Sequence, residues 1–304
     1  MTSGFLPPAP FGRVLTAMVT AFHDDGSVDL DGTARVAEHL AATGHDGVVV
    51  SGTTGEAPTT TTEEDGRILR AVIEAVGDRL SVVAGVGTNN TRHSIELAEQ
   101  AEKLGADGVL LVTPYYSKPS QEGVAAHFEA VADASSLPVM LYDIPGRSSI
   151  PIAEDTYKRV AAHERIVAVK DAVGDLYRGV RIMAETGLTF YSGDDVLNLG
   201  WLTHGAAGIV SVVGHVAGRE HAELVAAVDR GDLATALNIY RRLVPVVDAV
   251  MHRAPGAVSA KALMQLAGVL PNRNVRLPLL PASDDVVAHL RATLTSAGLL
   301  EETT

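Results

Sequence analysis

The stretch Thr91–Leu104 (TRHSIELAEQAEKL), followed by Gly108–Thr113 (GVLLVT), contains the unit that decides the fold. In the first part, apolar side chains recur at helical spacing from Ile95 to Leu104, and charged side chains occupy the opposite face. The second part is a short apolar run, which is typical of a buried strand. The sequence therefore predicts a helix followed by a strand.

Similar apolar runs recur along most of the chain, each followed by a plausible helix. The candidate strands are Val14–Thr20, Gly47–Ser51, Ser81–Val86, Gly108–Thr113, Pro138–Asp143, Ile166–Asp171, Thr189–Ser192 and Gly208–Val212. Eight such βα units within about 220 residues predict a closed (β/α)8 TIM barrel rather than an open doubly wound sheet.

The strand pattern stops near Asp229, and the rest of the chain is rich in Ala and Leu with helical spacing. The helical pattern is interrupted near Pro255-Gly256. We therefore expect a flexible tail at residues 1–10, a catalytic barrel at 11–231 and a C-terminal helical region at 232–304. No long linker separates the two folded parts.

Composition restricts the class of protein. A net charge of −13 disfavours binding to nucleic acid or to anionic membranes, and the chain contains no cysteine for disulfides or thiolate chemistry. No apolar run reaches the roughly 18 residues that a membrane helix needs. Residues 1–10 lack the basic start and the apolar core of a signal peptide. A cytoplasmic protein is expected.

Lys170 is the most informative single residue, because it closes the apolar run Ile166–Val169 of a predicted buried strand. Strand alternation would place it on one face with Ile166 and Ala168. A buried lysine without a partner tends to lose its proton, and a neutral amine attacks carbonyl groups. The other interpretation is an ion pair with Asp171, although Asp171 points to the opposite face if the strand continues.

Polar motifs follow several predicted strands, at the end of a barrel where active sites form. They are Ser51–Glu56 (SGTTGE), Thr113–Pro119 (TPYYSKP), Tyr142–Ser148 (YDIPGRS) and Ser192–Asp195 (SGDD). Hydroxyls between glycines suit a bound carboxylate or form a simple turn. A tyrosine here either relays protons or only packs, and an arginine can bind a carboxylate through two hydrogen bonds.

Two other features carry little functional signal. The eleven histidines show no metal-binding spacing, so a metal-dependent aldolase is not expected. The stretch Gly85–Asn90 (GVGTNN) lacks the third glycine of a dinucleotide fingerprint.

Taken together in this order, the motifs resemble those of the dihydrodipicolinate synthase family, within the superfamily that includes N-acetylneuraminate lyase. The resemblance extends from Gly12 to about Leu300, and YDIPGRS and TPYYSKP look most like the actinobacterial form. It implies a Schiff-base lyase that condenses pyruvate with aspartate semialdehyde in lysine and diaminopimelate biosynthesis. No cofactor and no metal are implied, because the pyruvate imine forms on the protein itself.

The resemblance also implies roles for individual residues. Lys170 would form the Schiff base, and Tyr142 would donate and accept protons through the Thr54 hydroxyl and Tyr116. In the family, that last tyrosine comes from a neighbouring subunit, so a homotetramer built as a dimer of dimers is expected.

A second group of residues would bind the substrates. Thr53 and Thr54 would hold the pyruvate carboxylate, and Gly193 and Val210 would line the pyruvate pocket. Arg147 would bind the carboxylate of aspartate semialdehyde.

Two alternatives remain open at this point. One is another pyruvate-dependent aldolase that cleaves a sugar acid or 4-hydroxy-2-oxoglutarate; Arg147 and the Tyr115-Tyr116 pair favour the synthase. The other is a silent barrel that only binds a 2-oxo acid, which would need no proton relay.

Regulation is expected to differ from that of lysine-inhibited relatives. Those relatives bind lysine through a tyrosine, an asparagine, a glutamate and histidines after GTTGE. Tyr115 and Asn89 match this pattern, but no histidine follows Glu56 in the segment 57–65, and His93 stands where the glutamate is expected. Loss of the carboxylate partner predicts weak or absent inhibition by lysine, unless Glu56, Glu63 or Asp65 takes the place of that partner.

Overall fold

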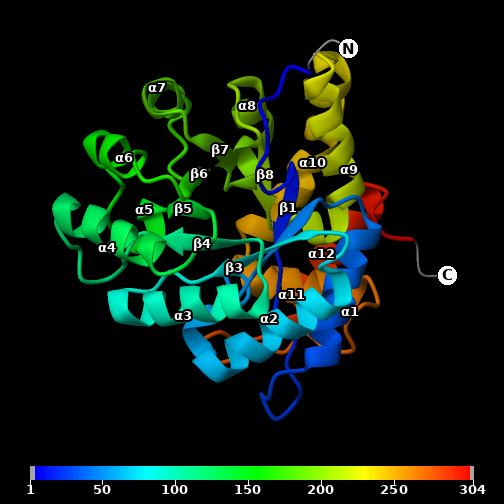
Figure 1. The fold of residues 1–304 in the computed structure, drawn as a ribbon. Helices are drawn as coiled ribbons and strands as arrows, with labels where there is room; N and C mark the ends of the chain where they lie inside the picture. The colour runs from blue at the N-terminus through cyan, green and yellow to red at the C-terminus, as the bar shows by residue number, and fades with distance from the viewer. Residues whose placement is uncertain (1–3, 302–304) are drawn as a thin grey trace.

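The protein, described over residues 4–301 by a computed structural model, is a closed barrel of eight parallel strands surrounded by helices, as predicted (Figure 1). Each strand pairs with the next, and β8 pairs with β1. The strands are β1 (Val14–Ala17), β2 (Gly47–Val50), β3 (Ser81–Gly85), β4 (Gly108–Val112), β5 (Val139–Asp143), β6 (Ile166–Asp171), β7 (Thr189–Ser192) and β8 (Gly208–Ser211).

Helices follow the strands on the outside of the barrel, with a further group at the C-terminal end. They are α1 (Leu30–Ala42), α2 (Thr62–Val76), α3 (Thr91–Leu104), α4 (Gln121–Asp133), α5 (Pro145–Ser148), α6 (Glu154–Val160), α7 (Leu176–Thr186), α8 (Asn198–Thr203), α9 (Gly214–Asp229), α10 (Leu233–Met251), α11 (Gly256–Leu266) and α12 (Asp284–Ser296). Short 3₁₀ turns, η1 (Ala57–Thr59) and η2 (Asp195–Leu197), follow β2 and β7.

Helix boundaries follow from side chains that cap the backbone. Helix α2 starts with a capping box, in which the Thr61 side chain accepts from the Glu64 N–H and the Glu64 side chain accepts from the Thr61 N–H. Helix α3 starts after Asn90, and it ends at Gly105 in the left-handed conformation that glycine adopts without strain. Both helices therefore begin and end where their sequences predict.

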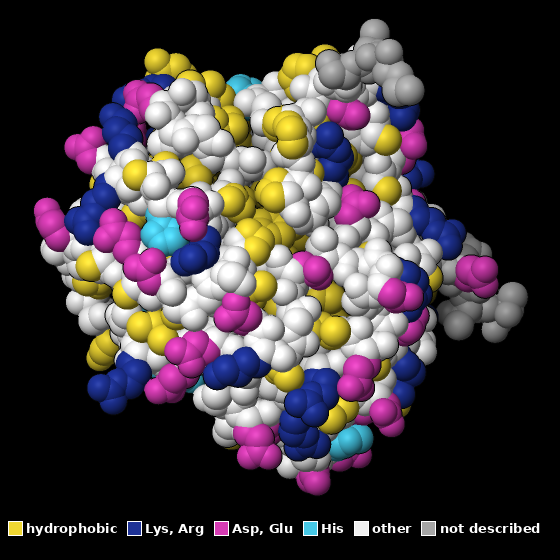
Figure 2. All heavy atoms as spheres, in the orientation of Figure 1, with side chains coloured by type: hydrophobic (Ala, Val, Ile, Leu, Met, Phe, Trp, Pro, Cys, Tyr) yellow, Lys and Arg dark blue, Asp and Glu magenta, His cyan; other side chains and the backbone are white. Residues whose placement is uncertain are grey.

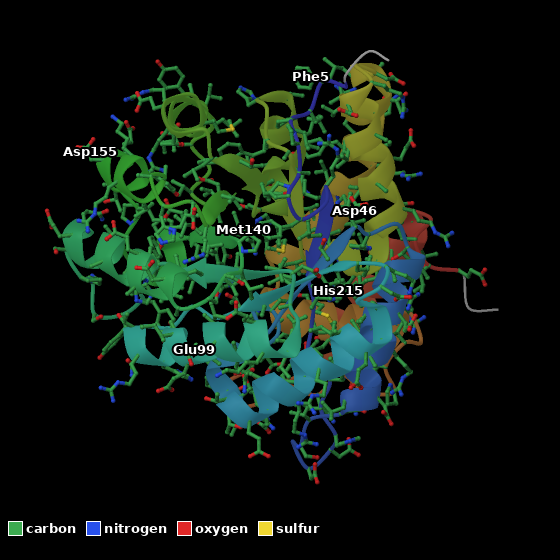
Figure 3. The ribbon with its side chains drawn as sticks, viewed as in Figure 1. Phe5, Asp46, Glu99, Met140, Asp155 and His215 are labelled. Carbon is green, nitrogen blue, oxygen red and sulfur yellow. The ribbon has the colours of Figure 1, made fainter. Side chains whose placement is uncertain are left out.

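Two apolar layers hold the barrel together. Inside, side chains such as Leu15, Val49 and Met140 fill the interior, and other strand residues pack outward against the helices. Figure 3 shows Met140 near the middle of the barrel and Glu99 and Asp155 on the outer helices α3 and α6. This packed interior leaves polar side chains to gather at the strand ends.

Strand β6 departs from simple alternation. Val139 pairs with Ile166, but Met140 pairs with Ala168, so β6 carries one extra residue at this point. Ile166 consequently packs in the outer cluster while Ala168 packs inside the barrel. The expectation that Ile166 shares a face with Ala168 and Lys170 is wrong because of this bulge.

The C-terminal helices pack beside the β1–β8 side of the barrel, where α10 contacts α9 and α12. Of the expected tail, residues 1–3 lie outside the described residues. At Phe5 and Leu6 the chain is attached, because their backbone N–H groups donate to the backbone and side chain of Asp229. The division of the chain at residues 231 and 232 stays a prediction.

The surface carries charges of both signs. Figure 2 shows acidic and basic side chains spread over one face, with hydrophobic side chains near its centre. Within residues 4–301, no helix is both long enough and apolar enough to cross a membrane.

Candidate active site

Strands β5 and β6 bring Tyr142 and Lys170 side by side. The two residues are paired in the sheet register, and Tyr191 of β7 is the partner of Lys170 on its other side. The Lys170 Nζ lies 4.2 Å from the centre of the Tyr142 ring. The amine and the phenol are thus neighbours inside the barrel mouth.

Lys170 is only 4% exposed, and no carboxylate oxygen within residues 4–301 lies within ion-pair distance of its amine. Burial lowers the pKa of Lys170 to about 8; the negative charges of Asp195 and Asp194 oppose this shift, and Arg147 adds to it. A substantial neutral fraction therefore exists in mildly alkaline solution. The expected alternative, an ion pair with Asp171, is not formed.

Tyr142 remains protonated over the same pH range. Burial raises the pKa of its phenol well above the usual value, and the nearby Arg147 works in the opposite direction. A neutral phenol beside an amine can donate a proton to a developing alkoxide and take it back later.

The segment after β7 passes directly beside Lys170. A Cβ at Gly193 would lie 2.7 Å from Lys170 Cγ and 2.8 Å from the Asp171 carbonyl oxygen, so only glycine fits there. The Gly193 N–H donates to the Asp171 carbonyl oxygen at 2.7 Å. Any side chain at position 193 would displace the lysine.

Asp195 is a buried anion near Lys170 to which no role was assigned from the sequence. Its carboxylate accepts from the Ser211 hydroxyl at 2.5 Å, from the Val212 and Val213 N–H groups at 2.8 and 2.9 Å, and from Asn198 at 2.9 Å. Four donors fix the charge and tie the loop after β7 to the end of β8. The second aspartate of SGDD was the available signal.

An acidic pair lies behind the site, on the outer side of strands β5 and β6. Asp143 and Asp171 are register partners and buried; the pKa of each is raised by burial, to about 7 and about 6. Tyr157 donates to Asp143 at 3.1 Å, and Arg178 lies 3.7 Å away. Sequence reasoning missed this pair, although each acid directly follows a predicted catalytic residue.

The remaining predicted residues are not all brought together. Thr54 is buried in the loop after β2, and Val210 lies on the inner face of β8. Within residues 4–301 of this single chain, no hydrogen bond joins the Thr54 hydroxyl to Tyr142. Tyr116 is 86% exposed, with a left-handed φ of 74°, and within residues 4–301 its phenol makes no hydrogen bond to Thr54 or Tyr142.

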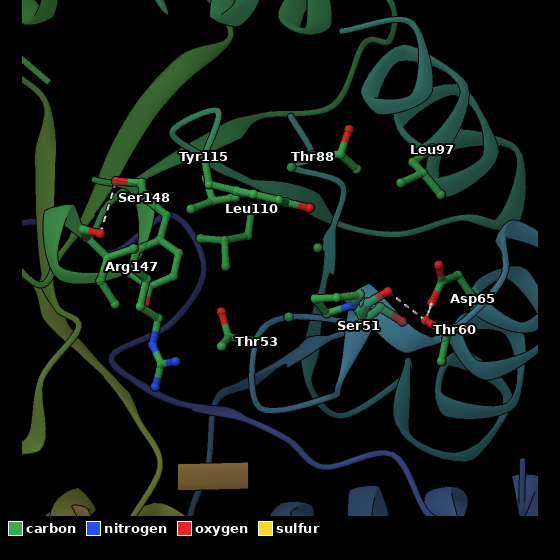
Figure 4. Close-up of a pocket in the computed structure, with 18 of the residues that line it drawn as sticks. Ser51, Thr53, Thr60, Asp65, Thr88, Leu97, Leu110, Tyr115, Arg147 and Ser148 are labelled. Carbon is green, nitrogen blue, oxygen red and sulfur yellow. Dashed lines mark hydrogen bonds between the residues drawn. The ribbon is translucent and has the colours of Figure 1, made fainter. Parts of the chain in front are cut away.

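A cavity of about 270 Å³ adjoins Tyr142. Three of the predicted residues line it, namely Thr53, Tyr142 and Arg147, whereas Lys170 does not. Figure 4 shows Arg147 and Thr53 at one end of this cavity and Asp65 with Thr60 at the other. The cavity therefore leads from the predicted substrate side towards α2 and α3.

Nearly the whole chain is similar to known proteins. The model of the dihydrodipicolinate synthetase family matches residues 10–297. The chain belongs to the dihydrodipicolinate synthetase family. The expected family and barrel fold are both confirmed.

Similar proteins include two actinobacterial relatives named 4-hydroxy-tetrahydrodipicolinate synthase. The relative from Kineococcus radiotolerans is 60% identical over 96% of this chain and 95% of its own length. The one from Acidothermus cellulolyticus is 56% identical over 97% and 96%.

Solved structures agree with these relatives. A dihydrodipicolinate synthase from Bacillus anthracis, 43% identical, superposes with a TM-score of 0.90 over 94% of this chain and 98% of its own. The enzyme from Cyanidioschyzon merolae with lysine bound is 40% identical, with a TM-score of 0.92 over 96% and 100%.

Proposed function

We propose that this chain condenses pyruvate with L-aspartate 4-semialdehyde and acts as a 4-hydroxy-tetrahydrodipicolinate synthase in lysine and diaminopimelate biosynthesis. The observation that carries the proposal is a buried, unpaired lysine beside a protonated tyrosine at the mouth of the barrel. Relatives at 60% and 56% identity over nearly the full length carry that enzyme name.

Lys170 begins the reaction as a nucleophile. Its neutral amine adds to the ketone carbon of pyruvate, and loss of water leaves an imine. The imine withdraws electrons from the methyl group, so loss of a methyl proton gives an enamine. No external cofactor enters this scheme, because the lysine itself supplies the electron sink.

Tyr142 handles protons in the next steps. The enamine carbon attacks the aldehyde, and the new alkoxide takes its proton from the Tyr142 phenol. Thr54 passes protons between Tyr142 and Tyr116 of a neighbouring subunit. The substrate amine then displaces Lys170 and closes the six-membered ring, which frees the lysine.

Five residues bind the substrates in this proposal. Thr53 and Thr54 hold the pyruvate carboxylate, and Gly193 and Val210 line the pyruvate pocket. Arg147 binds the carboxylate of the aldehyde substrate; its place on the cavity beside Tyr142 supports this role.

The same proposal includes the organisation of the protein. The proposed active form is a homo-oligomer in the cytoplasm, a dimer of dimers; the exposure of Tyr116 supports a contribution of this side chain to a neighbouring subunit. The barrel at 11–231 carries the chemistry, and the helical region at 232–304 supports it.

The direct experiment is an assay of pyruvate with aspartate semialdehyde, run beside sialic acid, sugar-acid and 4-hydroxy-2-oxoglutarate substrates. The expected result is that, of these substrates, only aspartate semialdehyde with pyruvate is turned over fast. Faster turnover of any other substrate would replace the proposed function by that of another aldolase of the superfamily.

A further inference from the structure

Glu56 closes the SGTTGE motif in an unusual conformation. Its φ is 60°, in the left-handed region that a glutamate rarely occupies, and it begins the turn η1. Both carboxylate oxygens are engaged, one by the Lys261 amine at 3.0 Å and the other by the Arg276 N–H at 2.9 Å. A strained residue beside a binding loop persists only where its surroundings hold it.

Lys261, on α11 in the C-terminal helical region, holds the Glu56 side chain in place. The Lys261 and Glu56 side chains are each only 1% exposed. The Lys261 amine also donates to the Asn274 carbonyl oxygen at 2.6 Å and lies 4.3 Å from the centre of the Phe22 ring. Its donors are therefore directed at fixed partners.

Three other hydrogen bonds hold the loop between β2 and η1, one of them from the Ala57 N–H to the Gly52 carbonyl oxygen at 3.3 Å. The Thr20 hydroxyl donates to the Gly55 carbonyl oxygen at 2.8 Å, and the Glu56 N–H donates to the Thr53 carbonyl oxygen at 3.2 Å. Thr54 lies between these contacts. A change in the backbone at Glu56 would therefore move Thr53 and Thr54.

We propose that Glu56 and Lys261 form a positioning pair that fixes the Thr53–Thr54 turn for the pyruvate carboxylate. The C-terminal helical region is then a working part of the active site through α11. This inference rests on the substrate-binding role proposed for Thr53 and Thr54.

The pair acts on geometry rather than on stability. A buried ion pair contributes little net stability compared with apolar side chains of similar volume, because both charges lose their water. Its hydrogen bonds nevertheless orient the carboxylate and hence the backbone of Glu56. Replacing the pair should weaken pyruvate binding more than it weakens the fold.

The test uses the full-length double variant Glu56→Gln/Lys261→Met. Lys158→Met is the matched control, because the Lys158–Glu185 ion pair has the same 3.0 Å distance but lies at the surface. Measurements are the KM for pyruvate, kcat, thermal unfolding and borohydride trapping of pyruvate. The single variant Glu56→Gln, which keeps the side-chain shape, serves if the double variant does not fold.

In the double variant, a displaced Thr53–Thr54 turn should contact the pyruvate carboxylate less well. The KM for pyruvate should therefore rise about tenfold, while kcat changes far less and the temperature of unfolding is nearly unchanged. Lys158→Met should behave as wild type. A wild-type KM in the double variant overturns the inference, as does activity that falls only in step with unfolding. Failure of wild type to trap pyruvate at Lys170 would instead overturn the proposed function.

Discussion

Two lysines, Lys170 in the barrel mouth and Lys261 in α11, share their gross environment and differ in their partners. Both are buried, both lie just over 4 Å from the centre of an aromatic ring, and burial lowers the pKa of each to about 8. Lys261 has a carboxylate at 3.0 Å and a carbonyl oxygen at 2.6 Å. Lys170 has neither contact among the described residues.

The difference teaches that burial alone does not identify a nucleophile. Lys261 uses its amine protons for fixed hydrogen bonds, and the adjacent Glu56 favours its charged form. Lys170 has the same lowered pKa, but its amine makes no hydrogen bond among the described residues, so its lone pair in the neutral form is free to attack a carbonyl. The unpaired lysine is suited to chemistry and the paired one to structure.

The largest expected effect is complete loss of activity in Lys170→Ala, because the proposed imine forms on this residue. Tyr116→Phe should also be nearly inactive, because it breaks the proton relay. In a hetero-oligomer of the two variants, one site would combine the intact Lys170 of one subunit with the intact Tyr116 of its neighbour. Activity should therefore return on mixing, as measured in purified hetero-oligomers against each homo-oligomer. Absence of any rescue would show that each site is self-contained.

The second prediction contrasts the stability of two methionine variants at pH 7. Lys261→Met leaves Glu56 buried without its partner and should lower the free energy of unfolding by about 3–5 kcal/mol. Lys170→Met removes an unpaired buried charge and should raise it by about 3 kcal/mol, given a folded pKa of about 8 and an ordinary value of 10.5. Denaturant unfolding measures both changes.

The pH dependence sharpens this contrast. The cost of burying charged Lys170 is fully present below pH 8 and fades as the pH rises towards 10.5, where the unfolded chain also loses the proton. The advantage of Lys170→Met should shrink over that window. An advantage that stays constant across it would mean that Lys170 is not a strained cation at neutral pH.

Some of the features behind these predictions could be predicted from the sequence, and others could not. Lys170 was recognisable because it follows an apolar run, and alternation placed it on one face with Ala168, which packs inside the barrel. Lys261 was not, since it lies in an Ala-rich helix and its partner Glu56 is 205 residues away in the chain. The bulge at Val167 was also invisible, because strand register is set by the pairing with β5.

The third prediction concerns Arg147, the positive charge that also lowers the pKa of Lys170. Arg147→Ala removes a charge-assisted contact and should cost on the order of 1.5–3 kcal/mol in binding the aldehyde substrate. Imine formation with pyruvate should survive. Steady-state kinetics and trapping separate the two steps, and loss of trapping with unchanged aldehyde binding would refute the assignment.

The smallest expected effect is that of free lysine, whose ammonium group can be compared with those of Lys170 and Lys261. The cavity wall includes His93, Tyr115 and Asp65, and the Asp65 carboxylate already accepts from the Thr60 hydroxyl at 2.7 Å. Glu56 is occupied by Lys261 and the Arg276 backbone. The ammonium group of a lysine bound in this cavity would therefore meet one carboxylate, that of Asp65, which is already hydrogen-bonded and lies near the His93 imidazole. Titration in the coupled assay should show little inhibition, and half-inhibition at submillimolar lysine would contradict this.

Reductive trapping tests the contrast between the two lysines most directly. Wild-type protein is treated with pyruvate and borohydride, digested, and mapped by mass spectrometry. We predict a reduced pyruvate adduct on Lys170, loss of activity in proportion to labelling, and no adduct on Lys261. An adduct on Lys261 or Lys118, or inactivation without label on Lys170, would contradict the assignment of the unpaired lysine as the nucleophile.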